Sequence, residues 1–398
     1  MKTYLLIIFA LFISQISNAQ DEKTVTVTGV GFISDGNKEK ARETALQDAR
    51  RMAISQAFGT YVQSETQVEN FVTVRDAIST NTTGFIKSDK IIKETPLSDR
   101  YEVEIEATVS LQPIKQDAQV LADMVGGINF IVIYDNRELN EEQIDYFEHA
   151  YEKINQILNT KQYSRTEATI AKNIMELLPS GLGEVDYLNS VGLYSNSEFI
   201  IQIKKLEVTT KEDAMGNFRS SAYIEFKSYD GCNWRNLGTF DGRSEYKSSA
   251  DKKKAAYDAI DEVLRQSFDG LFIQFNRDIY SWVNKGAPYE FRFYKFDKMS
   301  TSNWYDFMDK LIAESGYIIG EPQDEKTDDF VVIRFRSKKT RYAVARTFFK
   351  IAMQVSSLSA LSPEEKIKYG RQISYVPDGV DVPDIEKKIE IRKKLGTQ

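Results

Sequence analysis

The residue types that most often carry out catalysis or bind metals are scarce in this 398-residue chain. Histidine catalysis and most zinc sites need histidines, and the sequence holds only His149. A buried helical stripe is predicted at Ile144, Phe147, Tyr151, Ile154 and Leu158. His149 follows Ile144 by five positions, about 140° around the helix from this stripe, so we expect it to face water. HExxH and CxxC motifs are absent. A Ser-His-Asp or Cys-His catalyst is therefore not expected.

Other reactive or ligand-binding patterns are incomplete. The only cysteine, Cys232, stands beside a predicted turn and reads as a buried small side chain, although a lone thiol could react. Gly29-x-Gly31 stands where a dinucleotide fingerprint would, but Ser34 replaces the third glycine, so we predict a turn. Residues 135–137 lack the pattern of a calcium loop and read as a helix N-terminal cap. We predict no catalytic, cofactor-binding or metal-binding residue, and no cofactor.

Two residue classes leave alternatives open. Aspartate and glutamate number 59, so a hydrolase that uses two carboxylates in a deep cleft remains an alternative. Exposed Trp234, Trp282 or Trp304 would form platforms for a peptide or a glycan, whereas core packing is the more common role. A peptide- or glycan-binding module is therefore the second alternative.

Residues 1–19 read as a cleavable secretory signal peptide. Lys2 supplies the positive start, residues 4–16 the apolar run, and Ser17-Asn18-Ala19 the small residues before a cut at Gln20. The run is too short for a bilayer, which needs about 20 apolar residues, and no later run approaches that length. We expect an exported mature chain without a transmembrane segment, in the periplasm or, as the alternative, outside the cell.

Composition limits the partners and the fold. The formal net charge is −7, with acidic and basic residues interspersed, a surface that does not favour nucleic acid or anionic lipid. Tyrosine and phenylalanine are abundant, at 21 and 23, whereas proline numbers 8, which indicates ordered, sheet-rich domains. At roughly 150 residues per domain, the length predicts two or three.

Residues 20–113 predict a β-α-β-β-β domain. Strands are expected over 25–30, 60–74, 85–94 and 101–109, of which the last alternates strictly between apolar and polar residues. Small residues recur at every fourth position of the helix after the first strand: Ala41, Ala45, Ala49, Ala53 and Ala57. This smooth stripe should let the helix lie unusually close to the sheet. A linking helix is expected over 114–127.

Two more domains and a tail follow. Residues 128–285 predict an α/β domain with a central strand over 128–134, a hairpin at 215–217 and a closing helix over 250–275. Residues 286–360 predict a small ferredoxin-like domain that lacks one strand. Residues 361–398 are charged and read as a mobile tail. The predicted fold class is α+β, with three small mixed α/β domains after a signal peptide.

Residues 25–110 resemble the N-terminal domain of the flagellar T-ring protein FlgT and of related envelope lipoproteins. The resemblance rests on Gly29-x-Gly31, on Ala-Arg-x-x-Ala-Leu-x-Asp-Ala at 41–49, on Ala53 with Gly59, and on the strand at 101–109. The order of elements in the middle domain is similar to the TolB N-terminal and CsgG type.

The rest of the chain departs from FlgT. The third domain does not match its C-terminal domain, and the signal peptide ending in Asn18-Ala19-Gln20 resembles those of Bacteroidota, which mostly lack flagella. An exported Bacteroidota family is the better comparison. Because these relatives bind other envelope proteins and none is an enzyme, the resemblance implies a non-enzymatic scaffold or assembly factor. Its expected partners are other envelope proteins, and assembly into a homo-oligomer is compatible with the resemblance.

Overall fold

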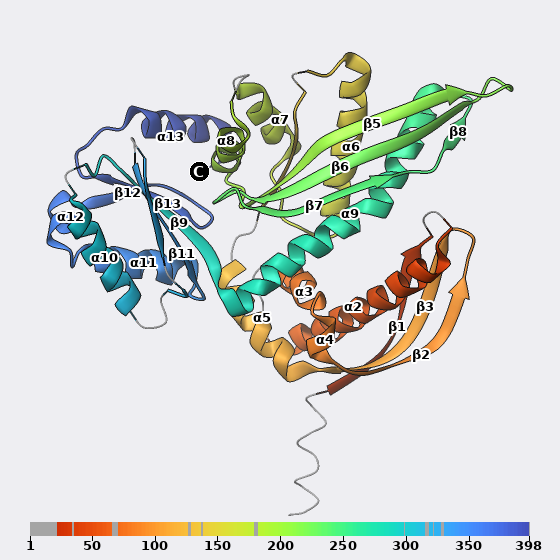
Figure 1. Cartoon of the computed structure of the whole chain (residues 1–398), viewed down its shortest axis with the longest axis horizontal. Coiled ribbons are helices and arrows are strands. Elements are labelled where there is room, and N and C mark those ends of the chain that lie inside the picture. The colour runs from red at the N-terminus through yellow and green to blue at the C-terminus, as the bar shows by residue number, and fades with distance from the viewer. Residues whose placement is uncertain are drawn as a thin grey trace, which may run out of the picture. The chain divides into compact units, whose positions relative to one another are not determined.

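The computed structural model describes most of the chain after the predicted signal peptide, which itself lies outside the described residues. The described ranges are 22–33, 36–65, 71–125, 129–136, 138–178, 182–297, 299–314, 318–320, 322–327 and 330–397. They fall in two compact units, Met1–Ala122 and Asp123–Gln398. Helices and three mixed or antiparallel sheets give an α+β fold, as the sequence predicts (Figure 1).

The first unit is an antiparallel sheet in the order β1-β3-β2, with its long helix α2 packed on β1 and β3. Its elements are β1 (Glu22–Phe32), α2 (Lys38–Glu65), α3 (Phe71–Ser79), α4 (Thr82–Phe85), β2 (Ile86–Pro96), β3 (Arg100–Ser110) and α5 (Leu111–Val125). The linking helix predicted over 114–127 is α5.

The alanine stripe of α2 is buried along its whole length. Two glycines of β1 face it at very short range. A Cβ atom on Gly29 would lie 2.1 Å from the backbone nitrogen of Ala49, and one on Gly31 would lie 2.0 Å from the carbonyl oxygen of Ala41. The predicted close approach of helix to sheet is confirmed, and it needs glycine on the strand as well as alanine on the helix.

The strand predicted over 60–74 is wrong. Helix α2 continues to Glu65, and α3 begins at Phe71. Val74, Ala77 and Ile78 are fully buried at the spacing of one helical face, so their packing overrides the strand preference of valine and isoleucine. The order in this unit is β-α-α-α-β-β-α, not β-α-β-β-β.

Replacing Gly29 by alanine should destabilise the first unit by about 1–3 kcal/mol or more, because the new methyl group overlaps the backbone of α2. Gly59→Ala is the matched control, since a Cβ there meets nothing within 4 Å in the helix. That change should stabilise by about 0.5–1 kcal/mol. Urea unfolding followed by circular dichroism measures both, and equal effects would contradict the close packing.

The second unit begins with a sheet in the order β4-β5-β6-β7, in which β4 and β5 are parallel and β8 pairs with β6. Its strands are β4 (Phe130–Tyr134), β5 (Phe199–Glu212), β6 (Phe218–Asp230), β7 (Asn236–Arg243) and β8 (Lys247–Ser249). Its helices are α6 (Glu141–Thr160), α7 (Ala168–Leu177), α8 (Glu184–Ser195) and α9 (Lys252–Lys285).

The hairpin predicted at residues 215–217 is confirmed as the connection between β5 and β6. Two other expectations for this region differ from the structure. Strand β4 lies at the end of the sheet order, not in its centre, and it stays buried because α6 and α7 pack on it. Helix α9 extends to Lys285, beyond the predicted end at 275, and the added turns bring Ile279, Trp282 and Val283 into the core.

A second sheet in the same unit has the order β10-β11-β9-β13-β12. Its elements are β9 (Ala287–Tyr294), α10 (Thr301–Ala313), β10 (Gln323–Lys326), β11 (Phe330–Ser337), α11 (Arg341–Ala352), α12 (Ser356–Leu361), β12 (Pro363–Tyr369), β13 (Gln372–Pro377) and α13 (Pro383–Leu395). The predicted boundary at 285/286 falls between the two sheets, but both belong to one compact unit.

The mobile tail predicted for residues 361–398 is wrong. A hairpin, β12–β13, supplies the strand that the predicted ferredoxin-like domain lacks, and β13 pairs in parallel with β9. Ile367, Tyr369, Ile373 and Tyr375 are buried, while most of the charged residues that suggested a tail are exposed or half-buried on the same elements. The high density of charged residues suggested a tail, although buried apolar residues alternate with exposed or half-buried charged ones along β12.

The two faces of the second sheet differ in character. One face is aromatic and packs under α10 and α11, where the rings of Phe291 and Phe348 lie 4.1 Å apart. The other face carries polar and charged residues, among them Glu290, Arg334 and Gln372, which are neighbours in the strand register. This charged face is linked through Arg371 to the β4-β5-β6-β7 sheet of the same unit, and it contains the candidate site.

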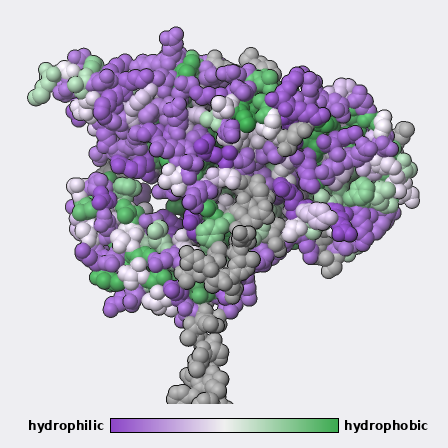
Figure 2. Space-filling model, turned by 180° about the vertical axis from the view of Figure 1, so that it is seen from behind, coloured by the Kyte–Doolittle hydropathy of each residue, from purple (hydrophilic) through white to green (hydrophobic). Residues whose placement is uncertain are grey.

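Surface character agrees with the interspersed charge. The face drawn in Figure 2 is mainly hydrophilic, with apolar residues scattered among polar ones. Within the described ranges, no helix combines the length and the apolar character that crossing a membrane requires.

Candidate functional site

Arg371 joins the two sheets of the second unit. It precedes β13, and its guanidinium donates through Nη1 to Glu198 Oε2 at 2.5 Å and through Nη2 to Asp230 Oδ2 at 2.5 Å. Its Nε donates to the carbonyl oxygen of Pro288 at 2.9 Å. All three charged side chains are almost completely buried. The arginine therefore ties the residues flanking β5 and β6 to the second sheet.

The surroundings of Arg371 leave no spare room. The guanidinium lies over the ring of Trp282, 4.4 Å from its centroid. The backbone N–H of Arg371 donates to Cys232 Sγ at 3.2 Å. Gly370 has a φ of +48°, and a Cβ there would lie 2.5 Å from the same sulfur. Burial raises the pKa of the Cys232 thiol well above its usual value, and the interpretation of Cys232 as a buried side chain is confirmed.

A third buried carboxylate, that of Glu290, holds a pair of arginines. It accepts from Arg292 Nε at 2.8 Å, from Arg334 Nε at 2.9 Å and from Gln372 Nε2 at 3.1 Å. Gln372 also donates to the carbonyl oxygen of Cys232 at 3.0 Å. Gln372 thus connects the cluster around Arg371 with the cluster around Glu290. The guanidinium groups of Arg292 and Arg334 are held at fixed positions by Glu290.

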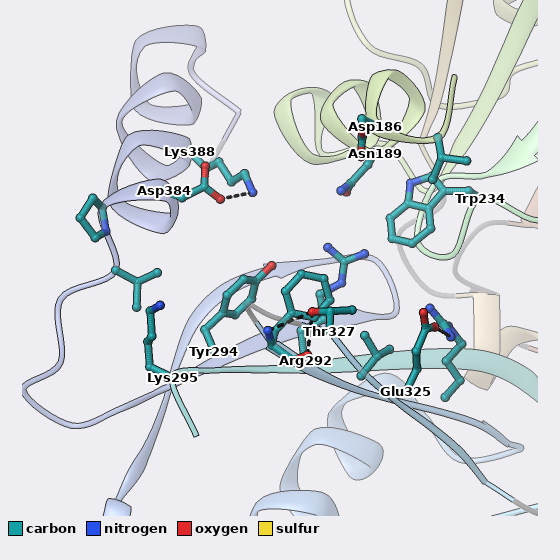
Figure 3. Close-up of a pocket in the computed structure, with 16 residues that line it drawn as sticks. Asp186, Asn189, Trp234, Arg292, Tyr294, Lys295, Glu325, Thr327, Asp384 and Lys388 are labelled. Atoms are coloured by element: carbon teal, nitrogen blue, oxygen red, sulfur yellow. Dashed lines mark hydrogen bonds and ion pairs between the residues drawn. The ribbon is translucent and has the colours of Figure 1, made fainter. Parts of the chain in front are cut away.

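These two arginines form the floor of a pocket of about 460 Å³ (Figure 3). Its other walls come from four parts of the unit: the turn after β6, the polar face of the second sheet, α8 and α13. The residues labelled in Figure 3 are Asp186, Asn189, Trp234, Arg292, Tyr294, Lys295, Glu325, Thr327, Asp384 and Lys388.

Trp234 forms one wall of this pocket. Its side chain is half-buried, and its backbone has a φ of +58°. The guanidinium of Arg292 lies over its ring, 4.6 Å from the centroid. Trp282 and Trp304 are buried in the two cores, so core packing is confirmed for them and they offer no platform. Of the three tryptophans, Trp234 alone borders this pocket.

Some of the charged side chains around the pocket form ion pairs with one another. Glu325 pairs with Arg334 at 2.7 Å, and Asp384 pairs with Lys388 at 2.5 Å. Lys295 adds an exposed cation on the rim. The ion pairs of Glu325 and Asp384 hold the side chains of Arg334 and Lys388 in place. The pocket therefore offers aromatic surface and fixed charges for binding.

His149 is not where the sequence places it. Its ring stacks on Tyr257, with 3.8 Å between centroids, and its Nε2 lies 2.8 Å from Asp261 Oδ1. The side chain is 14% exposed. The prediction that it faces water is wrong because α9 packs against this face of α6, a contact that the helical stripe of α6 alone does not reveal.

The other candidate motifs have structural roles. Gly29 and Gly31 lie within β1 against α2, so the predicted turn is a strand at these positions. The helix cap predicted at 135–137 is Asn140, whose side chain accepts from the N–H of Gln143 at 2.9 Å; Arg137 lies outside the described residues. No group of three or more metal-ligand side chains occurs within the described ranges.

Sequence reasoning missed the residues on which the pocket depends, Arg371, Glu198, Asp230 and Glu290. One signal was present. Glu290 and Arg292 alternate with aromatic residues in a strand whose every residue is buried, and a charge in such a position needs a charged partner elsewhere. The identity of the partners could not be read from the strand.

Comparisons with known proteins give little. No family model matches the chain, and no curated protein does. Among solved structures, the chain is similar to a protein described as a neuraminyllactose-binding hemagglutinin homolog from Helicobacter pylori, at 11% identity over 40% of this chain and 83% of that one, with a TM-score of 0.19. It is also similar to a protein described as a lipoprotein from Caulobacter crescentus CB15, at 14% identity over 26% and 87%, with a TM-score of 0.14. Likenesses this weak carry no argument, and the resemblance to FlgT stays a prediction.

Replacing Arg371 by glutamine should destabilise the second unit by about 3–5 kcal/mol, because Glu198 and Asp230 lose their shared cation while still buried. Arg346→Gln, on the exposed side of α11, is the control and should change stability by less than about 0.5 kcal/mol. Denaturant unfolding compares them. Similar losses in both variants would contradict the role of the buried pair.

Cys232 should resist alkylation in the folded protein at pH 8, because it is buried and its pKa is raised. Labelling with iodoacetamide should become fast only when denaturant unfolds the second unit. Mass spectrometry of the labelled cysteine measures the rate. Fast labelling of the native protein, at the rate of a free thiol peptide, would contradict the packing around Arg371.

Proposed function

We propose that the protein is a non-enzymatic, exported protein of the cell envelope that acts as a scaffold or assembly factor, holding a segment of another envelope protein in the pocket beside Trp234. The observation that carries this proposal is the pocket itself. It places an aromatic wall and two arginines, fixed by the buried Glu290, in one space of about 460 Å³.

The composition of the pocket favours a polypeptide as its occupant. Tryptophan, tyrosine and arginine are the side chains most enriched at the energetically important positions of protein interfaces. The pocket has all three, in Trp234, Tyr294 and Arg292. Its volume is within the range of about 300–1,000 Å³ that suits a ligand the size of a few residues.

The alternatives receive less support. The guanidinium of Arg292 covers one face of the Trp234 ring, so only its other face is left for the platform that a glycan needs. A two-carboxylate hydrolase needs one carboxyl group that donates a proton, whereas two of the three carboxylates that line the pocket, Glu325 and Asp384, are each paired with a cation. Export rests on the signal peptide predicted at residues 1–19, and the envelope setting on the resemblance of residues 25–110.

A photo-crosslinking amino acid at Asn189, on the α8 wall of the pocket, should capture a defined envelope protein in intact cells. The same amino acid at Lys350 is the control, since that residue is exposed on α11, which covers the opposite face of the sheet. Trp234→Ala should reduce the Asn189 product about tenfold or more, as expected for an aromatic hot spot.

Capture from Asn189 that Trp234→Ala abolishes, with none from Lys350, supports the proposal and identifies the partner by mass spectrometry. Equal capture from both positions, or no product from Asn189, would sink it. Thermal unfolding of each variant establishes that the second unit remains folded.

A further inference from the structure

The polar face of the second sheet contains another hollow, on the other side of Arg334. This second pocket has a volume of about 310 Å³. Arg235, Arg334 and Arg336 contribute to its lining, together with the apolar residues Ile319 and Pro288. Arg334 is common to the two pockets, whereas Arg235 and Arg336 line only the second.

The three arginines are not equally neutralised. Arg235 pairs with both oxygens of Asp278, at 3.0 and 2.6 Å. Arg334 pairs with Glu290 and Glu325. Arg336 instead donates through Nη1 to the carbonyl oxygen of Gly286 at 2.9 Å, and among the described residues no carboxylate pairs with it.

The surroundings make this unpaired charge costly. Arg336 is half-buried, and burial together with the neighbouring Arg235 lowers the pKa of its guanidinium. A half-buried cation that no described carboxylate pairs with favours an added anion.

We propose that this second pocket binds a carboxylate attached to a small apolar group, with Arg336 as its principal partner. A guanidinium matches the planar, two-oxygen geometry of a carboxylate. Ile319 and Pro288 give the apolar contact for the attached group. The volume suits one or two residues of a peptide end or a small organic acid. This site goes beyond the pocket at Trp234 and does not depend on it.

The test uses the whole mature chain and defined probes. Isothermal titration with N-acetyl-Ala-Phe should show saturable binding, whereas its C-terminal amide should not bind. Binding of 3-phenylpropionate as well would show that any such acid is accepted, and binding of the peptide alone would assign the site to a peptide C-terminus. Equal binding of the amide, stronger binding of inorganic phosphate, or no binding of either acid overturns the proposal.

Variants locate the site. Arg336→Gln should weaken the binding of N-acetyl-Ala-Phe about 10- to 100-fold, the loss expected for one charged hydrogen-bonding partner. Arg336→Lys keeps the charge without the paired donors and should give an intermediate loss even if the glutamine variant is unstable. Arg346→Gln on α11 is the matched control and should bind as the unaltered chain does. Unchanged affinity in both Arg336 variants would refute the assignment.

Discussion

The guanidinium of Arg371 lies between the carboxylates of Glu198 and Asp230, which stand at one end of the β4-β5-β6-β7 sheet. The backbone of Arg371 continues into β13 of the other sheet of this unit. Burying three charges costs desolvation energy, so an apolar contact of the same size could stabilise as much. What the ion pairs add is geometry, because in this placement of the two sheets the donors of Arg371 reach Glu198, Asp230 and the carbonyl oxygen of Pro288 at once. Asp230 also accepts the N–H of Cys232 at 3.0 Å and so fixes the turn that carries Trp234.

Sequence periodicity found the elements whose burial is decided locally. The alanine stripe of α2, the stripe of α6 and the β5–β6 hairpin all follow from spacing of 3.6 or 2 residues. It failed in two places. At residues 71–79, Val74, Ala77 and Ile78 have helical spacing, but valine and isoleucine also favour strands, so the local sequence supports both structures. At His149 a distant segment decides, because α9 packs on α6 and covers the side chain, and this partner is not visible within α6 itself.

The candidate site was beyond reach for the same reason. Its residues come from α8, the turn after β6, strands β9 to β11 and α13, which are separated by many tens of positions in the chain. Composition could suggest that a tryptophan matters but not which one. The half-buried Trp234 differs from Trp282 and Trp304 only in the elements that surround it.

The β12–β13 hairpin has a bearing on the order in which the molecule can assemble. Strand β13 pairs with β9, and Thr397 donates from Oγ1 to the carbonyl oxygen of Tyr194 at 2.6 Å, so late residues hold early ones in place. A chain that is synthesised from its N-terminus can fold its first unit early. The second unit is complete only with residues 363–377, and until they are made Glu198 and Asp230 lack Arg371. Both pockets therefore form only after nearly the whole polypeptide is available.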